Sequence, residues 1–212
     1  MTIVKICGLS SPEHLLVAAA AGADYIGLVF APSRRQVSIS TAQHLVATLR
    51  DAGYATQVVG LFVNESATTI ASTVATCGLD VVQLHGTETY DIVAQLPTIP
   101  IWKALRLNGS TDETAWLTTS DSQVTPLVDA PITATQFGGT GATADWNAAT
   151  MLARKRRIVL AGGLTPSNVP TAIQRVAPWG VDVSSGVERA GYKDNGLIAA
   201  FIDLAKAASE VA

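Results

Sequence analysis

Ionisable side chains end several short apolar runs of this 212-residue sequence. Cys7 closes the run VKIC, His85 follows VVQL, Asp129 follows PLV, and Asp182 lies within VDVS. Thiol, imidazole and carboxyl groups take up and release protons, and burial and neighbouring charges tune how readily they do so. We expect Cys7 and Asp129, at the very ends of their runs, to serve function more than structure.

Glycines and serines follow the later apolar runs. GGTG spans positions 138–141, a glycine pair spans 162–163, and SSG spans 184–186. Glycine-rich turns beside the start of a helix present backbone N–H groups and the helix dipole to an anion. These loops therefore predict a phosphorylated substrate, held by Gly141, Gly162, Gly163, Ser184, Ser185 and Gly186.

The elements that must position these groups repeat along the chain. Short runs rich in apolar and β-branched residues predict strands at 3–7, 25–30, 57–63, 81–84, 101–105, 126–129, 158–161 and 181–184. Stretches with helical spacing follow them, at 12–21, 41–51, 67–76, 88–96, 112–117, 145–154, 166–176 and 196–208. This α/β pattern, with strands apolar on both faces, favours a single (β/α)8 TIM barrel over residues 1–212. An open doubly wound sheet is the alternative.

Such a barrel carries its chemistry at the carboxyl ends of its strands and binds phosphate after the seventh and eighth. Side chains alternate along a strand, which predicts five ionisable side chains in the lumen, Lys5, Cys7, Lys103, Asp129 and Asp182. An isolated buried charge costs several kcal/mol. Lys5, Lys103 and Asp182 therefore either form structural ion pairs or belong to the site, and both interpretations stay open.

Composition argues against several classes of protein. The net charge is −3 and charged residues make up 15% of the chain, so we expect no nucleic-acid partner. Two cysteines give no disulfide framework and no apolar run approaches ~18 residues, which favours a cytoplasmic protein without a membrane partner. Three scattered histidines make a poor metal site, and the dinucleotide-like pattern at 139–144 lies outside its usual context. We expect no cofactor.

The runs and loops together resemble one enzyme family. Its motifs are found here, in order, as KICGL, SRRQVS, VGLFVN, VVQLHG, WKALR, LVDA, GGTGATADW, LAGGLTPSNV and VDVSSGVE. This set, which covers nearly the whole chain, is similar to phosphoribosylanthranilate isomerase, a family of (β/α)8 barrels in tryptophan biosynthesis. The resemblance implies an Amadori rearrangement of N-(5-phosphoribosyl)anthranilate to 1-(2-carboxyphenylamino)-1-deoxyribulose 5-phosphate. This aldose–ketose isomerisation needs no cofactor or metal.

The resemblance assigns roles by position. Cys7 matches the general base, Asp129 matches the general acid, and Arg35 matches an arginine that contacts the anthranilate carboxylate of the substrate. We expect His85 and Asp182 to bind substrate as well. An acid at Asp129 must be protonated near neutrality, so we expect a raised pKa there, and we expect Lys5 to help Cys7 reach the thiolate form.

Two positions depart from the family pattern. Ala142 replaces a frequent lysine, which predicts a weaker phosphate or loop contact, and Ala190 replaces a usual proline, which predicts a looser last loop. The alternatives are a related barrel isomerase of histidine biosynthesis, which usually has an aspartate where Cys7 stands, and a dual-substrate enzyme. A pentulose-phosphate epimerase would need histidine ligands for a metal, and a non-catalytic phosphate-binding barrel is a further alternative. A monomer and a homodimer are both open.

Overall fold

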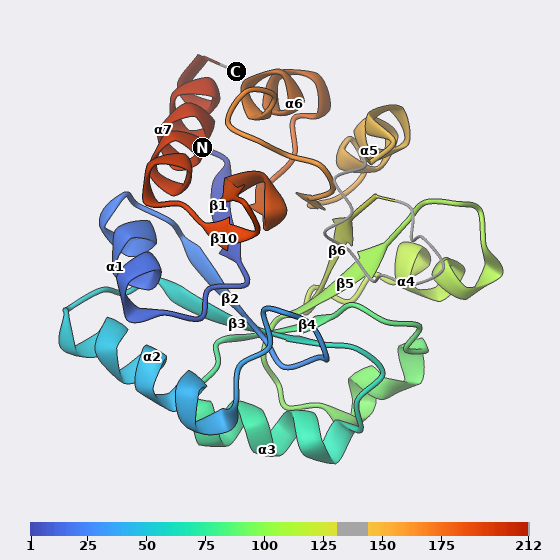
Figure 1. Cartoon of the computed structure of the whole chain (residues 1–212). Helices are drawn as coiled ribbons and strands as arrows, with labels where there is room; N and C mark the ends of the chain where they lie inside the picture. The colour runs from blue at the N-terminus through green and yellow to red at the C-terminus, as the bar shows by residue number, and fades with distance from the viewer. Residues whose placement is uncertain (131–143, 212) are drawn as a thin grey trace.

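The computed structural model describes residues 1–130 and 144–211, and eight parallel strands close into a barrel within them (Figure 1). The strands are β1 (Ile3–Cys7), β2 (Tyr25–Val29), β3 (Gln57–Phe62), β4 (Val81–Leu84), β5 (Ile101–Leu105), β6 (Val124–Val128), β7 (Val159–Leu160) and β8 (Gly180–Val183). Each pairs with the next, and β8 closes the barrel on β1, with Lys5 opposite Asp182. The predicted (β/α)8 barrel is confirmed, and the open sheet is wrong.

Helices pack around the outside of the barrel (Figure 1). Ser38 and Ser66 begin two of them because each hydroxyl accepts the backbone N–H three residues on. Gly78 ends one with a φ of 64°, a left-handed conformation that costs glycine little. The α-helices are α1 (Pro12–Ala20), α2 (Ile39–Asp51), α3 (Ala67–Cys77), α4 (Thr114–Thr118, preceded by the 3-10 turn η2, Thr111–Glu113), α5 (Trp146–Ala153), α6 (Val169–Val176) and α7 (Asn195–Val211).

The segment between β4 and β5 is not the α-helix that its sequence predicts. It forms a shorter 3-10 helix, η1 (Tyr90–Gln95). Glu88, expected to start the helix, instead accepts hydrogen bonds from the backbone N–H groups of Gly86 and Asn64. It also pairs with Lys103, whose Nζ lies 2.6 Å from Oε2. These contacts hold Glu88 against the barrel and out of a helix.

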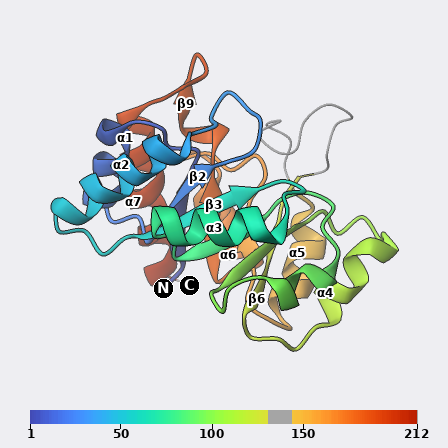
Figure 2. The same ribbon diagram turned by 90° about the horizontal axis from the view of Figure 1, so that it is seen from below.

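A hairpin that the sequence does not predict follows the last barrel strand, after the short helix η3 (Ser185–Val187). Its strands are β9 (Glu188–Arg189) and β10 (Tyr192–Lys193), and it stands beside the loop after β2 (Figure 2). Ala190 and Gly191 form the turn with φ values of 51° and 87°, as type I′ hairpin turns require. Proline is fixed near −65°, so it cannot occupy position 190 of this turn. Ala190 thus takes a conformation that the usual proline could not adopt, and the looser loop expected there stays a prediction.

Apolar side chains fill the barrel below its mouth. We call them the lumen cluster. Around Trp102 the rings of Tyr25 and Trp179 lie at centroid distances of 4.9 and 6.0 Å. The members of the lumen cluster are Val59, Val81, Trp102, Ala104, Leu127, Val159 and Ala161.

Lys103 does not share the lumen, so that expectation is wrong. Its neighbours Trp102 and Ala104 belong to the lumen cluster, and strand alternation therefore turns Lys103 outward to Glu88. Lys5 does face the lumen, is fully buried, and donates from Nζ to Asp182 Oδ1 at 2.9 Å. Both lysines thus form buried ion pairs, on opposite faces of the barrel wall.

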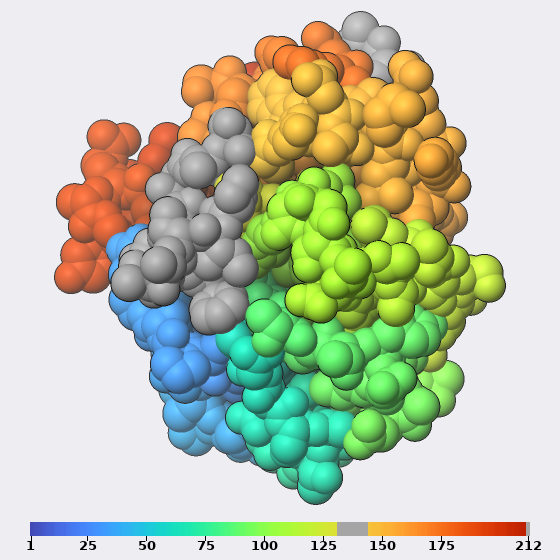
Figure 3. Space-filling model, turned by 90° about the vertical axis from the view of Figure 1, so that its right-hand side faces the viewer, coloured from blue at the N-terminus to red at the C-terminus, as the bar shows by residue number. Residues whose placement is uncertain are grey.

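Helices α4 and α5 cover one side of the barrel, which faces the viewer in Figure 3. Arg156, just after α5, joins them: its Nη1 donates to the carbonyl oxygens of Trp116 and Thr119 at 3.3 and 3.1 Å. These carbonyls lie at the C-terminal end of α4, where a positive charge is favourable.

Among residues 1–130 and 144–211, no helix is both long and apolar enough to cross a bilayer.

Candidate active site

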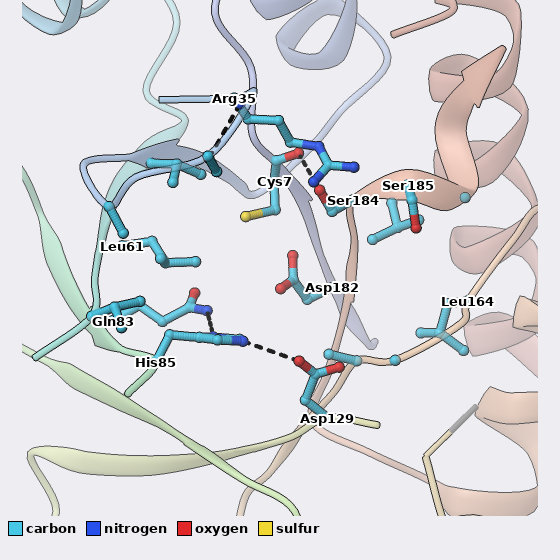
Figure 4. Close-up of a pocket in the computed structure, with 18 of the residues that line it drawn as sticks. Cys7, Arg35, Leu61, Gln83, His85, Asp129, Leu164, Asp182, Ser184 and Ser185 are labelled. Atoms are coloured by element: carbon cyan, nitrogen blue, oxygen red, sulfur yellow. Dashed lines mark hydrogen bonds and ion pairs between the residues drawn. The ribbon is translucent and has the colours of Figure 1, made fainter. Parts of the chain in front are cut away.

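A cavity of about 860 Å³ opens at the carboxyl ends of the barrel strands (Figure 4). Its size suits a small organic ligand. Every predicted site residue in the described part of the chain lines it, namely Cys7, Arg35, His85, Asp129, Gly162, Gly163, Asp182, Ser184, Ser185 and Gly186. Gly141 and Ala142 lie outside the described residues.

Cys7 ends β1 on one side of this cavity and is 4% exposed. Gly27 lies opposite it on β2, where a Cβ atom would lie only 2.9 Å from the Cys7 Sγ, so glycine makes room for the thiol. Ser184 Oγ donates to the Cys7 carbonyl oxygen at 3.3 Å and ties the end of β1 to β8. The Lys5–Asp182 pair lies on the same face of the barrel wall.

Burial raises the pKa of the Cys7 thiol. The charge of Lys5 acts to lower that pKa, but its partner Asp182 acts to raise it. Burial also acts against the charge on Lys5 itself, and Asp182 and Cys7 nonetheless raise the pKa of Lys5, so Lys5 stays cationic. Lys5 acts in the expected direction, but the pKa of Cys7 is nonetheless raised, because burial and then Asp182 outweigh the effect of Lys5. In the free protein Cys7 is a thiol near neutral pH.

Asp129 follows β6 on another side of the cavity, and both of its carboxylate oxygens have partners. Oδ1 accepts the backbone N–H of Ala130 at 2.8 Å, and Oδ2 lies 3.0 Å from His85 Nε2. The other ring nitrogen, Nδ1, lies 2.9 Å from Gln83 Nε2 (Figure 4). Asp129 therefore ends a row of three hydrogen-bonded side chains.

Burial acts to raise the pKa of Asp129, but its partners lower it further than burial raises it. The hydrogen bond and charge of His85 contribute most, and the charge of Arg106 and the Ala130 N–H add to them. The expected raised pKa is therefore wrong, because the sequence does not show that His85 reaches Asp129. The free protein holds a protonated thiol and an ionised carboxylate, the reverse of what the base and the acid of an isomerase need.

Arg34, Arg35 and Lys193 surround the carboxylate of Glu188, and we call these four residues the mouth cluster. Arg35 Nε and Nη2 donate to the two oxygens of Glu188 at 2.7 and 3.0 Å. Arg34 pairs with Oε2, and Lys193 Nζ lies 3.3 Å from Oε1. Three cationic side chains surround the single carboxylate of Glu188, so the mouth cluster has a net positive charge. Arg34 and Arg35 line the cavity, which places this charge at its edge. Such a site favours an anionic ligand.

Loops after β7 and β8 form another wall of the cavity. Gly162 and Gly163 have φ values of 77° and 64°. A Cβ atom would lie 2.5 Å from the Ala130 nitrogen if built on Gly162, and 1.8 Å from the Leu164 carbonyl oxygen if built on Gly186. The backbones of these loops therefore approach each other too closely for any residue with a side chain, so only glycine fits at these positions.

In residues 1–130 and 144–211, no three His, Cys, Asp or Glu side chains are arranged to hold a metal ion.

Comparison with known proteins identifies the family. The profile described as N-(5'-phosphoribosyl)anthranilate isomerase matches residues 4–204. The chain belongs to this family. An N-(5'-phosphoribosyl)anthranilate isomerase from Roseiflexus castenholzii is 48% identical over 211 residues, which cover 98% of this chain and 99% of the relative. One from Acetivibrio thermocellus is 43% identical over 212 residues, covering 95% of this chain and 94% of the relative.

Solved structures of the isomerase family share the fold. The phosphoribosyl anthranilate isomerase of Thermotoga maritima superposes with a TM-score of 0.84 at 34% identity, over 98% of this chain and all of that one. An isomerase in complex with reduced 1-(o-carboxyphenylamino)-1-deoxyribulose 5-phosphate gives a TM-score of 0.82 at 34% identity, with the same coverage.

The structure of this family member adds site residues that our sequence analysis missed. Gln83 lies two positions before His85, and strand alternation alone places both on one face. Arg34 stands beside Arg35, but the sequence does not show which arginine is the more buried. Glu188 and Lys193 carry a weaker signal, because only the short turn between them indicates a hairpin.

Proposed function

We propose that this chain converts N-(5'-phosphoribosyl)anthranilate to 1-(2-carboxyphenylamino)-1-deoxyribulose 5-phosphate. One observation carries the proposal: Cys7 and Asp129 face one cavity from strands on different sides of it, between the cationic mouth cluster and the glycine loops. A reaction that takes a proton from one substrate atom and gives one to another needs an acid and a base at separate places.

The substrate has two anionic ends, and the cavity has two matching walls. Arg35 offers its guanidinium to the anthranilate carboxylate at the rim. The loops at 162–163 and 184–186 receive the phosphate, as loops after the seventh and eighth strands commonly do in this fold. This orientation lays the ribose between the two walls, beside Cys7 and Asp129.

In the first step Asp129 gives its proton to the ribose ring oxygen. The bond between that oxygen and C1′ breaks, the anthranilate nitrogen supplies the electron pair, and an open-chain iminium forms. In the second step the Cys7 thiolate takes the proton from C2′, which gives an enolamine that tautomerises to the ketone. Each proton-transfer group typically contributes ~10²–10⁴ to the rate.

The active form has the same number of protons as the free protein but places one differently. The free protein has a Cys7 thiol and an Asp129 carboxylate, whereas the reaction needs a Cys7 thiolate and an Asp129 carboxylic acid. Transfer of one proton between the two groups interconverts these forms. Substrate binding must therefore favour the second form.

The test follows the loss of substrate fluorescence with purified protein, alongside a titration with the reduced product analogue. We expect turnover and binding together. Binding without turnover would contradict catalysis and favour a non-catalytic phosphate-binding barrel. An assay that reads conversion of the aminoaldose of histidine biosynthesis itself should show no turnover. The assembly stays a prediction of monomer or homodimer, for which a dimeric isomerase of Thermotoga maritima is a precedent.

A further inference from the structure

Gln83 reaches the proposed acid only through His85. Gln83 is fully buried from solvent, and His85 and Asp129 are 6% and 5% exposed. The distances are 2.9 Å from Gln83 Nε2 to His85 Nδ1 and 3.0 Å from His85 Nε2 to Asp129 Oδ2. Figure 4 shows the three side chains in a row along one side of the cavity. The imidazole thus connects the amide to the carboxyl group.

The amide decides which imidazole nitrogen carries the proton. A neutral imidazole has one N–H donor and one bare acceptor nitrogen. When the Gln83 NH₂ group donates to Nδ1, Nδ1 must be bare and Nε2 carries the proton. That proton then points at Asp129 Oδ2, which accepts it and so cannot hold a proton of its own aimed at Nε2. This is the arrangement of the free protein.

Rotation of the amide by 180° reverses the row. Gln83 Oε1 then accepts the proton of Nδ1, and the bare Nε2 accepts a proton held by Asp129. The row takes up one proton, the one that Cys7 releases as it becomes the thiolate: the proton on Nε2 passes to Asp129 Oδ2, and a proton binds Nδ1, so the total in the site is unchanged. Within the described residues Gln83 Oε1 has no hydrogen-bond partner and Nε2 has only His85, so no third group fixes the orientation of the amide.

We propose that Gln83 is a positioning residue for the general acid: during turnover its Oε1 faces His85 Nδ1, and the bare Nε2 lets Asp129 keep its proton. The substrate ring oxygen then replaces Nε2 as the acceptor of that proton. The inference rests on the proposed function, in which Asp129 is the acid. Arg106, the other charge that acts on Asp129, favours the carboxylate in both orientations, so the imidazole is the part of the row that changes.

Nitrogen-15 NMR of histidine reads the tautomer directly. The chain has three histidines, and the signals of His85 are those lost in His85→Asn. In the wild-type protein bound to the reduced product analogue we expect Nδ1 of His85 to be protonated. A proton that stays on Nε2 in that complex would overturn the inference. This measurement needs no variant of Gln83 to fold.

Two substitutions of Gln83 test the effect on turnover. Gln83→Met fills the space without a hydrogen bond, and we expect kcat to fall about 10- to 100-fold, part of what a general acid contributes. KM should stay near the wild-type value, and the basic limb of the pH–rate profile should move to lower pH, because Asp129 loses its proton more easily. Gln83→Glu can only accept from Nδ1 and should restore most of kcat. A raised KM with unchanged kcat in Gln83→Met would contradict the inference.

Asp129→Asn separates this inference from the proposed function. Wild-type turnover in Asp129→Asn would remove Asp129 from the acid role and with it the basis of the inference. An inactive Asp129→Asn, together with an Nε2–H tautomer in the wild-type complex, would overturn the role of Gln83 alone.

Discussion

Arg35 and Glu188 stand 153 positions apart in the sequence and meet as a bidentate ion pair at the mouth of the barrel. The guanidinium donates Nε to Oε1 at 2.7 Å and Nη2 to Oε2 at 3.0 Å. Glu188 thereby holds the planar fork in place before any ligand arrives. A substrate carboxylate therefore meets an arginine whose orientation is already fixed. Less conformational entropy of the Arg35 side chain is lost when the substrate binds.

Arg35→Ala should raise KM about 10- to 100-fold with little change in kcat, because a hydrogen bond to a charged group is worth about 1.5–3 kcal/mol. Arg34→Ala is the matched control. It removes an arginine from the same loop and the same Glu188 contact, but the Arg34 side chain is 51% exposed against 16% for Arg35. Steady-state kinetics decide the point, and equal effects in the two variants would refute the special role of Arg35.

Cys7→Ala and Asp129→Asn should each lower kcat by about 10²–10⁴ while the protein stays folded, because each removes one of the two proton-transfer groups. Cys77→Ala is the control for thiol loss, since Cys77 is buried on α3 and does not line the cavity. Circular dichroism checks the fold. Near-normal turnover in Cys7→Ala would remove it from the role of base, and the same outcome in Asp129→Asn would remove it from that of acid.

Lys193 should make ligand affinity depend on pH. Burial lowers the pKa of Lys193 to about 8, although Glu188 acts to raise it. As the pH rises through about 8, Lys193 loses its charge while both arginines of the mouth cluster keep theirs. An anionic ligand is then held less strongly, and the charge of its phosphate changes little over this range, because its second ionisation, with a pKa of about 6, is nearly complete at pH ~7.

The Kd of the reduced product analogue should therefore rise between pH ~7 and ~9 in the wild-type protein. Lys193→Arg keeps the positive charge across this range, so its Kd should change less. Isothermal titration calorimetry measures both. A parallel rise in the two proteins would assign the pH dependence to another group.

Gly186→Ala should weaken binding of inorganic phosphate and of the reduced product. The added methyl group would lie 1.8 Å from the Leu164 carbonyl oxygen, so the loops after β7 and β8 must separate. Overpacking of this kind costs about 1–3 kcal/mol, and we expect a Kd at least about tenfold higher. Gly53→Ala is the control for general destabilisation: its φ of 80° strains an alanine, but no other atom lies within 4 Å of the added Cβ and Gly53 does not line the cavity. If Gly53→Ala weakens binding equally, the effect is not local.

Most of the fold is predictable from the sequence, because each βα unit carries its own pattern. The errors arise where a distant contact overrides that pattern. Glu88 leaves its expected helix to meet Lys103, and Lys103 faces outward because Trp102 and Ala104 fill the lumen. Local periodicity predicts neither the Glu88–Lys103 ion pair nor the choice of Trp102 and Ala104 to fill the lumen.

The candidate site also has features that the sequence predicts and features that depend on distant contacts. The residue types and their places at strand ends predict site residues that line one cavity in the described part of the chain, and the roles assigned to them stay predictions. The pKa shifts of Cys7 and Asp129 are not predictable from the sequence, because they depend first on how deeply each group is buried and then on Asp182 and His85, which approach them from other strands. The Ala190–Gly191 turn shows the limit most clearly, since only the backbone reveals its two positive φ values.

The buried Lys5–Asp182 pair gives the last prediction, which concerns stability. Lys5→Met leaves the Asp182 carboxylate, 7% exposed, without its cation, and should lower the free energy of unfolding by about 3 kcal/mol. Lys5→Met combined with Asp182→Leu removes both charges and should recover most of that loss. The pKa of Lys5 is raised above its ordinary value of 10.5, so the pair stabilises fully below that pH and loses its effect only as the pH rises past the folded-state value. Urea denaturation between pH ~6 and ~9 should therefore give a constant difference between the wild type and Lys5→Met. A double variant no more stable than Lys5→Met would show that the loss comes from packing and not from the unpaired charge.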